Sequence, residues 1–308
     1  MEKKQFYENL KTPDGKIDVV LDTDTYNEID DQYALSYMIC NHDKFNIKGI
    51  FAAPFFGNGL SDSPHDGLLK SHDEILKLLK LLKCEELNDI VFKGSTDYLK
   101  NEKTPQNSEA AERLVELAKR YTPEKPLYVV AIAAITNIAS ALLMAPEIAE
   151  NIVIVWLGGH SFDYHDTKEF NMYQDIAASR VILNSDCPLV ILPCFGVVSG
   201  FVTTEYELKH WLGGKNDLCE YLVSRTIEYA EAYAKDKPWS RPLWDVTAIG
   251  WLLNTDNRFM YSRIEKRRLP GYDGMYSEEY TDKEMCYVYF INRDNLIEDL
   301  FNKLSLIN

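Results

Sequence analysis

An acidic stretch near the amino terminus, IDVVLDTDTYNEIDD, constrains this chain more than any other segment. Its apolar part, Val19–Leu21, has the character of a buried strand, and Asp22 and Asp24 come at the strand's carboxyl end. Asp30 and Asp31 then open a segment whose apolar residues recur as in an amphipathic helix. Four carboxylates so close together repel one another unless a proton or a cation lies among them. The stretch therefore predicts a strand-to-helix turn that holds a hard divalent cation through oxygen ligands.

Acidic turns of this kind also arise for purely structural reasons. A carboxylate in the first turn of a helix interacts favourably with the helix dipole, and Asp is a preferred N-cap residue. These effects account for one or two of the four acids. The place of the acids favours a functional role, because open α/β sheets bind ligands at the carboxyl ends of their strands.

Composition excludes several classes of function. The chain has 308 residues, of which 46% are hydrophobic, so a sizeable core is available and disorder is not expected. The net charge of −15 disfavours nucleic acid and anionic membranes as partners and suits a protein that holds a cation. The six cysteines form no C-x-x-C pair, and no segment has the character of a signal peptide or reaches transmembrane length. These features predict a cytoplasmic protein with reduced thiols.

The order of the predicted elements indicates the fold class. Apolar strands alternate with helices, as in an open α/β fold with a mostly parallel central sheet and helices on both faces. The expected strands are 17–21, 46–53, 90–92, 127–132, 152–157, 189–192 and 285–291. The expected helices are 30–40, 68–82, 108–121, 136–144, 205–211 and 217–234, with a closing helix before the carboxyl end. Residues 1–16 are expected to be a lead-in, and residues 1–308 to form a single domain, since no linker or repeat interrupts the chain.

Several motifs, in the same order along the chain, resemble the calcium-dependent nucleoside hydrolase family of the inosine–uridine-preferring type. They are the D-x-D…D-D pattern of residues 22–31, Gly57-Asn58, the AITNIA run of residues 134–139, Glu169-Phe170-Asn171 and Trp244-Asp245. The family has a tighter spacing between its acidic pairs, with Pro-Gly where this chain has the longer Thr25–Ile29. The resemblance covers essentially the whole chain and implies a Rossmann-like nucleoside hydrolase fold. Aromatic residues on the later helices suit an oligomer interface, so a homo-oligomer of unspecified subunit number is expected.

The resemblance also implies a reaction, the hydrolysis of the N-glycosidic bond of ribonucleosides to free base and ribose, as in purine or pyrimidine salvage. Family members use a water bound to Ca²⁺, and the matching general base here is Asp24. The implied ligands of the cation are the side chains of Asp24, Asp31 and Asp245 and the backbone carbonyl of Ile132. A bound divalent cation makes its water more acidic and fixes its position, and Ca²⁺ accepts about six to eight oxygen ligands in irregular geometry.

The same resemblance implies how the small-molecule ribonucleoside is held. The residues matched to the ribose contacts are Asp30, Asn58, Glu169 and Asn171. Trp244 stands where family members carry His or Trp, and Trp goes with stacking on a purine base. No histidine precedes Asp245, so the acid that protonates the leaving base stays open. His65 and His165, which lie in polar loops, are two candidates, and protonation by solvent is the third.

Two other functions stay open. The run DTDT also fits the D-x-D-x-T signature of haloacid-dehalogenase-like phosphatases, with Asp22 as nucleophile and Asp24 as general acid and base. Against this, the chain lacks the late acidic pair that such a phosphatase needs for Mg²⁺. The longer gap after Asp24 also permits a non-catalytic nucleoside-binding protein of the same fold. The presence of Asp24, Asp31 and Asp245 argues against that loss of turnover.

Overall fold

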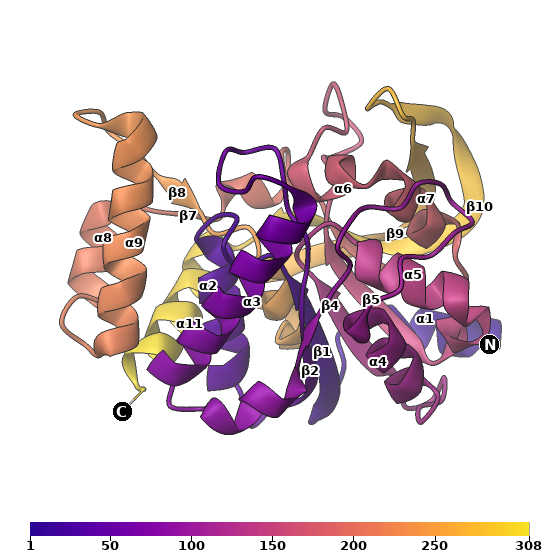
Figure 1. Ribbon diagram of the computed structural model, residues 1–308, viewed down its shortest axis with the longest axis horizontal. Helices are drawn as coiled ribbons and strands as arrows, with labels where there is room; N and C mark the ends of the chain where they lie inside the picture. Colours follow the sequence, from indigo (N-terminus) through magenta and orange to yellow (C-terminus); the bar gives the residue numbers. More distant parts are fainter. Residues whose placement is uncertain (308) are drawn as a thin grey trace.

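The central sheet is open and mostly parallel, as predicted. The computed structural model describes residues 1–307, apart from the side chain of residue 279, and eight strands of this part form one sheet (Figure 1). In sheet order they are β3 (Val91–Lys93), β2 (Phe45–Ala52), β1 (Ile17–Thr23), β4 (Leu127–Ala131), β5 (Ile152–Leu157), β6 (Leu189–Leu192), β10 (Tyr276–Ile291) and β9 (Met260–Pro270). Neighbouring strands pair in parallel, except β10 and β9, which are antiparallel.

Helices cover both faces of the sheet, which confirms the predicted fold class (Figure 1). The α-helices are α1 (Lys3–Asn9), α2 (Asp30–Cys40), α3 (Pro64–Leu81), α4 (Glu109–Ala118), α5 (Thr136–Met144), α6 (Phe170–Gln174), α7 (Ile176–Asn184), α8 (Glu205–Trp211), α9 (Asp217–Ala234), α10 (Val246–Leu252) and α11 (Arg293–Ser305). Short 3₁₀ turns lie at Glu85–Ile90, Pro146–Glu150, Val198–Gly200 and Thr255–Asn257.

Two hydrophobic cores follow from the alternation of side chains along the strands. Val19 and Leu21 of β1 point into a core shared with α2, α3, α10 and α11, whereas Val20 points into a core shared with α4, α5 and α7. Successive side chains of a strand point to opposite faces, so a strand buried on both faces is apolar at every position. The fully buried run of β5, IVIVWL, is the clearest example. The two cores, one on each face of the sheet, therefore bury β1 between them.

The structure differs from the predicted elements in several places. β10 begins at Tyr276, nine residues before the expected strand 285–291. Residues 1–16 contain the helix α1, whose Phe6 and Tyr7 pack against the first core, where the sequence indicated only a lead-in. β1 extends to Thr23, so Asp22 lies inside the strand and only Asp24 follows it. A two-stranded sheet of β7 (Val202–Thr203) and β8 (Arg241–Pro242) was not predicted, because pairs of such short segments carry no periodicity of their own.

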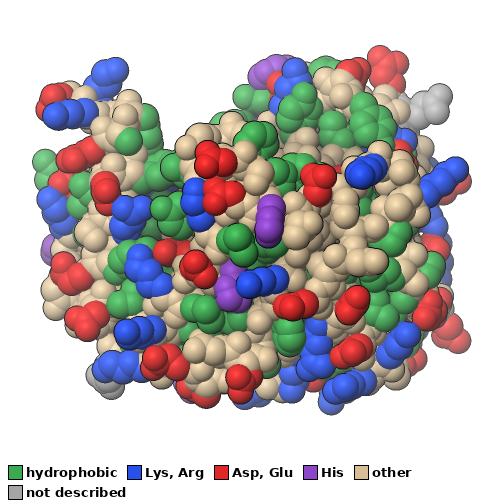
Figure 2. Space-filling view, viewed as in Figure 1, with side chains coloured by type: hydrophobic (Ala, Val, Ile, Leu, Met, Phe, Trp, Pro, Cys, Tyr) green, Lys and Arg blue, Asp and Glu red, His purple; other side chains and the backbone are tan. Residues whose placement is uncertain are grey.

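The distribution of charge on the surface and the apolar character of the helices indicate which kinds of partner the protein suits. Figure 2 shows acidic and basic side chains interspersed over one face, with apolar side chains in small groups among them. A mixed surface on a chain of net charge −15 differs from the basic stripe that binds nucleic acid. No helix within residues 1–307 combines the length and the apolar character that a membrane crossing requires.

Candidate active site

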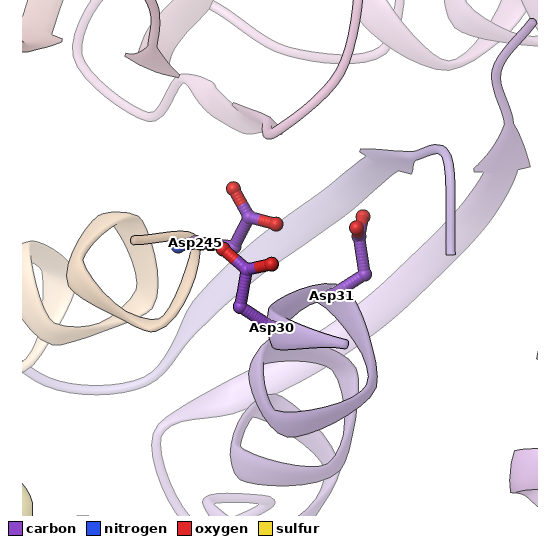
Figure 3. A group of neighbouring side chains, drawn as sticks. All are labelled: Asp30, Asp31 and Asp245. Atoms are coloured by element: carbon purple, nitrogen blue, oxygen red, sulfur yellow. Dashed lines mark hydrogen bonds between the residues drawn. The ribbon is translucent and has the colours of Figure 1, made fainter. Parts of the chain in front are cut away.

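Carboxylates from distant parts of the chain meet at the carboxyl end of β1. Asp24 follows this strand, Asp30 and Asp31 are the first residues of α2, and Asp245 immediately precedes α10. Asp30, Asp31 and Asp245 are buried, and each offers a carboxylate oxygen within 4.8 Å of those of the other two (Figure 3). The sequence predicted the side chains of Asp24, Asp31 and Asp245 as cation ligands. The group that the structure brings within this distance contains Asp31 and Asp245, with Asp30 in place of Asp24.

Hydrogen bonds hold these acids in place without using them as helix caps. The Thr23 hydroxyl donates to Asp31 Oδ1 at 2.5 Å, and the backbone N–H of Asp245 donates to Asp30 Oδ2 at 3.2 Å. Neither α2 nor α10 has a side-chain capping bond at its first residues. Capping therefore does not explain why the acids gather here.

The electrostatics of this acidic cluster (Asp24, Asp30, Asp31 and Asp245) favour a bound cation. Burial raises the pKa of Asp31 to about 8, and the neighbouring charge of Asp30 adds to the shift. Burial and mutual repulsion also raise the pKa of Asp24 and of Asp245. Asp24 Oδ2 is buried and has no hydrogen-bond partner within residues 1–307. Several oxygen donors, closely spaced and short of positive charge, fit a hard divalent cation such as Ca²⁺.

We expect calcium to stabilise the protein more at pH 8 than at pH 5. The carboxyls of the acidic cluster have folded pKa values above their unfolded value of about 4. The metal-free native state therefore binds more protons than the unfolded chain, and its free energy of unfolding falls as the pH rises from about 4 to about 8. At pH 8 a saturating cation replaces those protons and is expected to raise Tm by roughly 5 °C.

Thermal unfolding with calcium or with a chelator, at both pH values, measures this difference. At pH 5 protons compete for the carboxylates, so the shift in Tm should be clearly smaller. An equal shift at both pH values would show that the cation binds elsewhere.

A cavity of about 210 Å³ adjoins the acidic cluster and contains nearly all of the predicted site residues. The predicted residues that line it are Asp24, Asp30, Asp31, Ile132, Glu169, Asn171, Trp244 and Asp245. They come from the segment after β1, the start of α2, the segment after β4, the start of α6 and the segment before α10, and more than 200 positions separate the first of these segments from the last. The sheet therefore brings the separate motifs to one place.

Glu169 and Asn171 are fixed against the cavity by hydrogen bonds to the backbone. The Glu169 carboxylate accepts the N–H groups of Gly159, Asn171 and Met172 at 2.8 to 2.9 Å and caps α6. The Asn171 amide donates to the Leu157 carbonyl at 3.1 Å. Burial raises the pKa of Glu169 to about 7, although the three N–H donors oppose that shift. Both side chains are thus oriented before any ligand arrives.

Asn58 is the predicted site residue that the structure does not place in the cavity lining. It is exposed in the loop after β2, and its amide donates to the side chain and to the carbonyl oxygen of Asn27, the latter at 3.2 Å. Asn27 itself lines the cavity. The longer connection between β1 and α2 supplies Asn27, which separates Asn58 from the cavity.

The structure identifies His160 as a site residue that sequence reasoning missed. It follows Gly158-Gly159 after β5, is buried and lines the cavity, whereas His65 and His165 do not line it. Its Nδ1 accepts the Phe195 N–H at 3.2 Å, so the neutral ring carries its proton on Nε2. Burial lowers the pKa of His160 to about 4. A histidine directly after a Gly-Gly pair at a strand end was the available signal.

The position of Asp22 argues against the phosphatase alternative. Its side chain is fully buried inside β1, where Oδ1 accepts the Asn137 amide at 2.7 Å, and it does not line the cavity. A phosphatase nucleophile has to reach the phosphorus atom of its substrate. Asp22 therefore has a structural role, which is to bind the Asn137 amide inside the protein.

The fold and the site together define an α/β protein with a cavity at the carboxyl ends of its parallel strands. This cavity is rich in carboxylates, which suits it to a cation. Residues 19–288 match the family described as inosine-uridine preferring nucleoside hydrolase, and the chain belongs to that family. This membership confirms the resemblance found in the sequence and excludes the phosphatase alternative.

Individual relatives are distant. The pyrimidine-specific ribonucleoside hydrolase RihA of Escherichia coli O1:K1 / APEC is 25% identical over 190 residues, which are 60% of this chain and 59% of the relative. RihA of Salmonella arizonae is 27% identical over 168 residues, 53% of this chain and 52% of the relative. The chain thus matches less than two thirds of the length of these curated relatives.

Solved structures show the same fold at low identity. The purine-preferring ribonucleoside hydrolase from Gardnerella vaginalis superimposes with a TM-score of 0.73 at 19% identity, covering 94% of this chain and 98% of that one. A plant nucleoside hydrolase, PpNRh1, gives a TM-score of 0.73 at 17% identity, with coverages of 94% and 99%. These structures support the Rossmann-like nucleoside hydrolase fold that the sequence predicted.

Proposed function

We propose that this protein hydrolyses the N-glycosidic bond of ribonucleosides to free base and ribose. The observation that carries the proposal is the buried group Asp30, Asp31 and Asp245, which borders the same cavity as the fixed polar side chains Glu169 and Asn171. Family membership supports the reaction class. The proposed role is the release of bases for reuse.

Different groups around the acidic cluster have different proposed roles in the reaction. We propose that Asp24, Asp31, Asp245 and the carbonyl of Ile132 hold Ca²⁺, which when bound makes a water molecule more acidic and fixes its position. Asp24 Oδ2, which lacks a partner within residues 1–307, is free to accept the proton of that water. The transition state of glycoside cleavage resembles an oxocarbenium ion, and the surrounding carboxylates stabilise its positive charge.

The other side chains of the cavity suit the two parts of a nucleoside. Asp30, Glu169 and Asn171 offer the oriented polar groups that ribose hydroxyls require. Trp244 offers an aromatic surface for the base. The two related ribonucleoside hydrolases differ in base preference, since RihA is pyrimidine-specific and the Gardnerella vaginalis protein is purine-preferring. In this chain Trp244 favours a purine.

The test of the proposed function is base release from inosine, uridine and deoxyinosine, with calcium and with a chelator. We expect release from the ribonucleosides, its loss on chelation and its recovery when calcium is added back. Release from deoxyinosine should be slower by about 10⁴-fold, because a site built for hydroxyl groups leaves its buried polar atoms unpaired without them.

Two controls separate the alternatives. Phosphate release from p-nitrophenyl phosphate reports phosphatase activity and is expected to be at background. If calcium and inosine bind in a calorimeter but no nucleoside yields free base, the non-catalytic binding protein replaces the hydrolase as the preferred function.

A further inference from the structure

The longer connection between β1 and α2 places an additional acid in the cavity wall. This connection, Thr25–Ile29, contains Glu28, which lines the cavity with a partly exposed side chain. Glu28 forms an ion pair with Arg241, which is 213 positions further along the chain. Arg241 is buried, in β8, where it pairs with Thr203 of β7. The longer turn that distinguishes this chain from the family's pattern is thus joined, through Glu28, to the segment that leads to Trp244.

Besides Glu28, Arg241 contacts two further cavity residues, although it does not line the cavity itself. Its Nη2 lies 3.7 Å from Asp30 Oδ1, and its guanidinium carbon lies 5.1 Å from the centroid of the Trp244 ring. The guanidinium carbon also lies 4.7 Å from the centroid of Tyr229, on α9. Such distances are typical of cation–π contacts. One buried cation therefore touches the acid matched to ribose and the ring matched to the base.

Arg241 pairs more closely with Glu28 than with Asp30, and this affects the position of the Asp30 carboxylate. Glu28 takes the direct ion pair, so Asp30 stays at 3.7 Å from Arg241, beyond hydrogen-bond distance. Asp30 Oδ2 accepts the N–H of Asp245, while Oδ1 keeps capacity for another donor. Without Glu28, a buried guanidinium would take Asp30 as its main partner and draw the carboxylate away from the cavity, because an unpaired buried charge is costly.

We propose that Arg241 and Glu28 are positioning residues that hold Asp30 and Trp244 in place for the ribonucleoside. The inference rests on the proposed function and extends it to residues outside the family's motifs. Arg241 restrains both groups through its planar fork and its ring contacts, and Glu28 balances its charge so that Asp30 remains available for a ribose hydroxyl. Lysine cannot replace this geometry, because its ammonium is a point charge on a flexible stem.

The test compares hydrolysis of inosine and deoxyinosine by the wild-type protein and by Arg241→Met, Arg241→Lys and Glu28→Gln. We expect Arg241→Met to lower kcat/KM for inosine about 100-fold, the order of loss for a displaced positioning group. Deoxyinosine should be much less affected, so the preference for ribose should fall at least 10-fold. Arg241→Lys should recover only part of the loss, and Glu28→Gln should show a smaller loss of the same kind.

Arg180→Met is the matched control. Like Arg241, Arg180 pairs with an acid, Glu102 at 2.6 Å, and with an aromatic ring, Tyr272 at 5.6 Å, and it also donates to the Pro270 carbonyl. None of these three partners lines the cavity, whereas the partners of Arg241 include Glu28, Asp30 and Trp244 of its lining. Arg180→Met should keep the wild-type preference for ribose. The double variant Glu28→Gln/Arg241→Met should be no worse than Arg241→Met alone, because the two residues act as one unit.

Each outcome decides the inference. If the wild-type protein releases no base, the proposed function fails, and this inference fails with it. If the wild-type protein is active and a folded Arg241→Met keeps the wild-type preference for ribose, the inference alone is overturned. If Arg241→Met does not fold, Arg241→Lys and Glu28→Gln decide in its place, and an unchanged preference in both of them overturns it.

Discussion

Replacing Asp24 with Asn is expected to lower kcat for ribonucleoside hydrolysis by about 10⁴-fold, since the change removes the proposed general base and one proposed charged ligand of the cation. Asn keeps the size of the side chain but cannot accept a proton from water. In the structure Asp24 Oδ2 is buried with no hydrogen-bond partner within residues 1–307, so no other contact of that oxygen is lost. The measurement is base release from inosine at saturating calcium.

Asp18→Asn, in the strand that Asp24 follows, provides the control. Asp18 lies near the start of β1, where it accepts the Asn46 amide at 2.5 Å and the Tyr121 hydroxyl at 2.9 Å, away from the cavity. Its variant should have wild-type kcat. Calcium titration separates the two roles of Asp24, because loss of the base alone lowers kcat while calcium still binds. A kcat above a tenth of the wild-type value for Asp24→Asn would assign the base to another residue.

Replacing Arg267 with Met is expected to lower the free energy of unfolding by roughly 3 kcal/mol, a cost set by buried carbonyl groups left without donors. Arg267 is fully buried on β9 and donates hydrogen bonds only to backbone within residues 1–307. The acceptors are the carbonyls of Ile182, Ser185, Cys187 and Glu284, at 2.6 to 3.3 Å. Burial lowers the pKa of Arg267 to about 10, so the side chain is still charged at neutral pH. The Ile182 carbonyl also accepts the Ser185 N–H at 3.1 Å and the Ser185 hydroxyl at 2.8 Å, so we expect the cost to fall mainly on the carbonyls of Ser185 and Cys187, which follow the end of α7.

Urea unfolding in the presence of calcium measures this loss. The neighbouring Arg268→Met is the control, because Arg268 is only partly buried. It donates to the Ser277 carbonyl and lies over the rings of Phe162, Tyr276 and Tyr280, contacts that do not leave a group of buried carbonyls without donors when they are lost. Its cost should stay below about 1 kcal/mol. Equal costs for the two variants would mean that the buried carbonyls find other partners once Arg267 is removed.

The local pattern of apolar residues was enough to predict the main strands and helices of this protein. The apolar strand before Asp24, the helix that starts at Asp30, and the buried runs of β4 and β5 all lie where the sequence indicated. Strand and helix periodicity depends on residues close in the chain, so it can be recognised without knowing the fold. The motifs around Glu169 and Trp244 were recognised in the same local way, and the cavity contains them both.

The differences at the site arise from contacts between segments that are distant in the sequence. Asn58 was matched to ribose, but the structure pairs it with Asn27, a residue of the longer connection. His160 was passed over, because nothing in its own neighbourhood shows that the loop containing Phe195 folds against it. In each case the deciding partner lies more than 30 positions away in the sequence.

By itself, the sequence determined the alternation of strands and helices, the mostly parallel sheet, the acids at the end of β1 and the family. Only the tertiary structure decided that Asp30 joins Asp31 and Asp245, and that Arg241 pairs with Glu28. The physical reason is that local propensity and apolar periodicity act over a few residues, whereas the charges of the cavity interact through space. Which charges meet depends on where the sheet places β1 and the segment before α10, and no stretch of sequence contains that information.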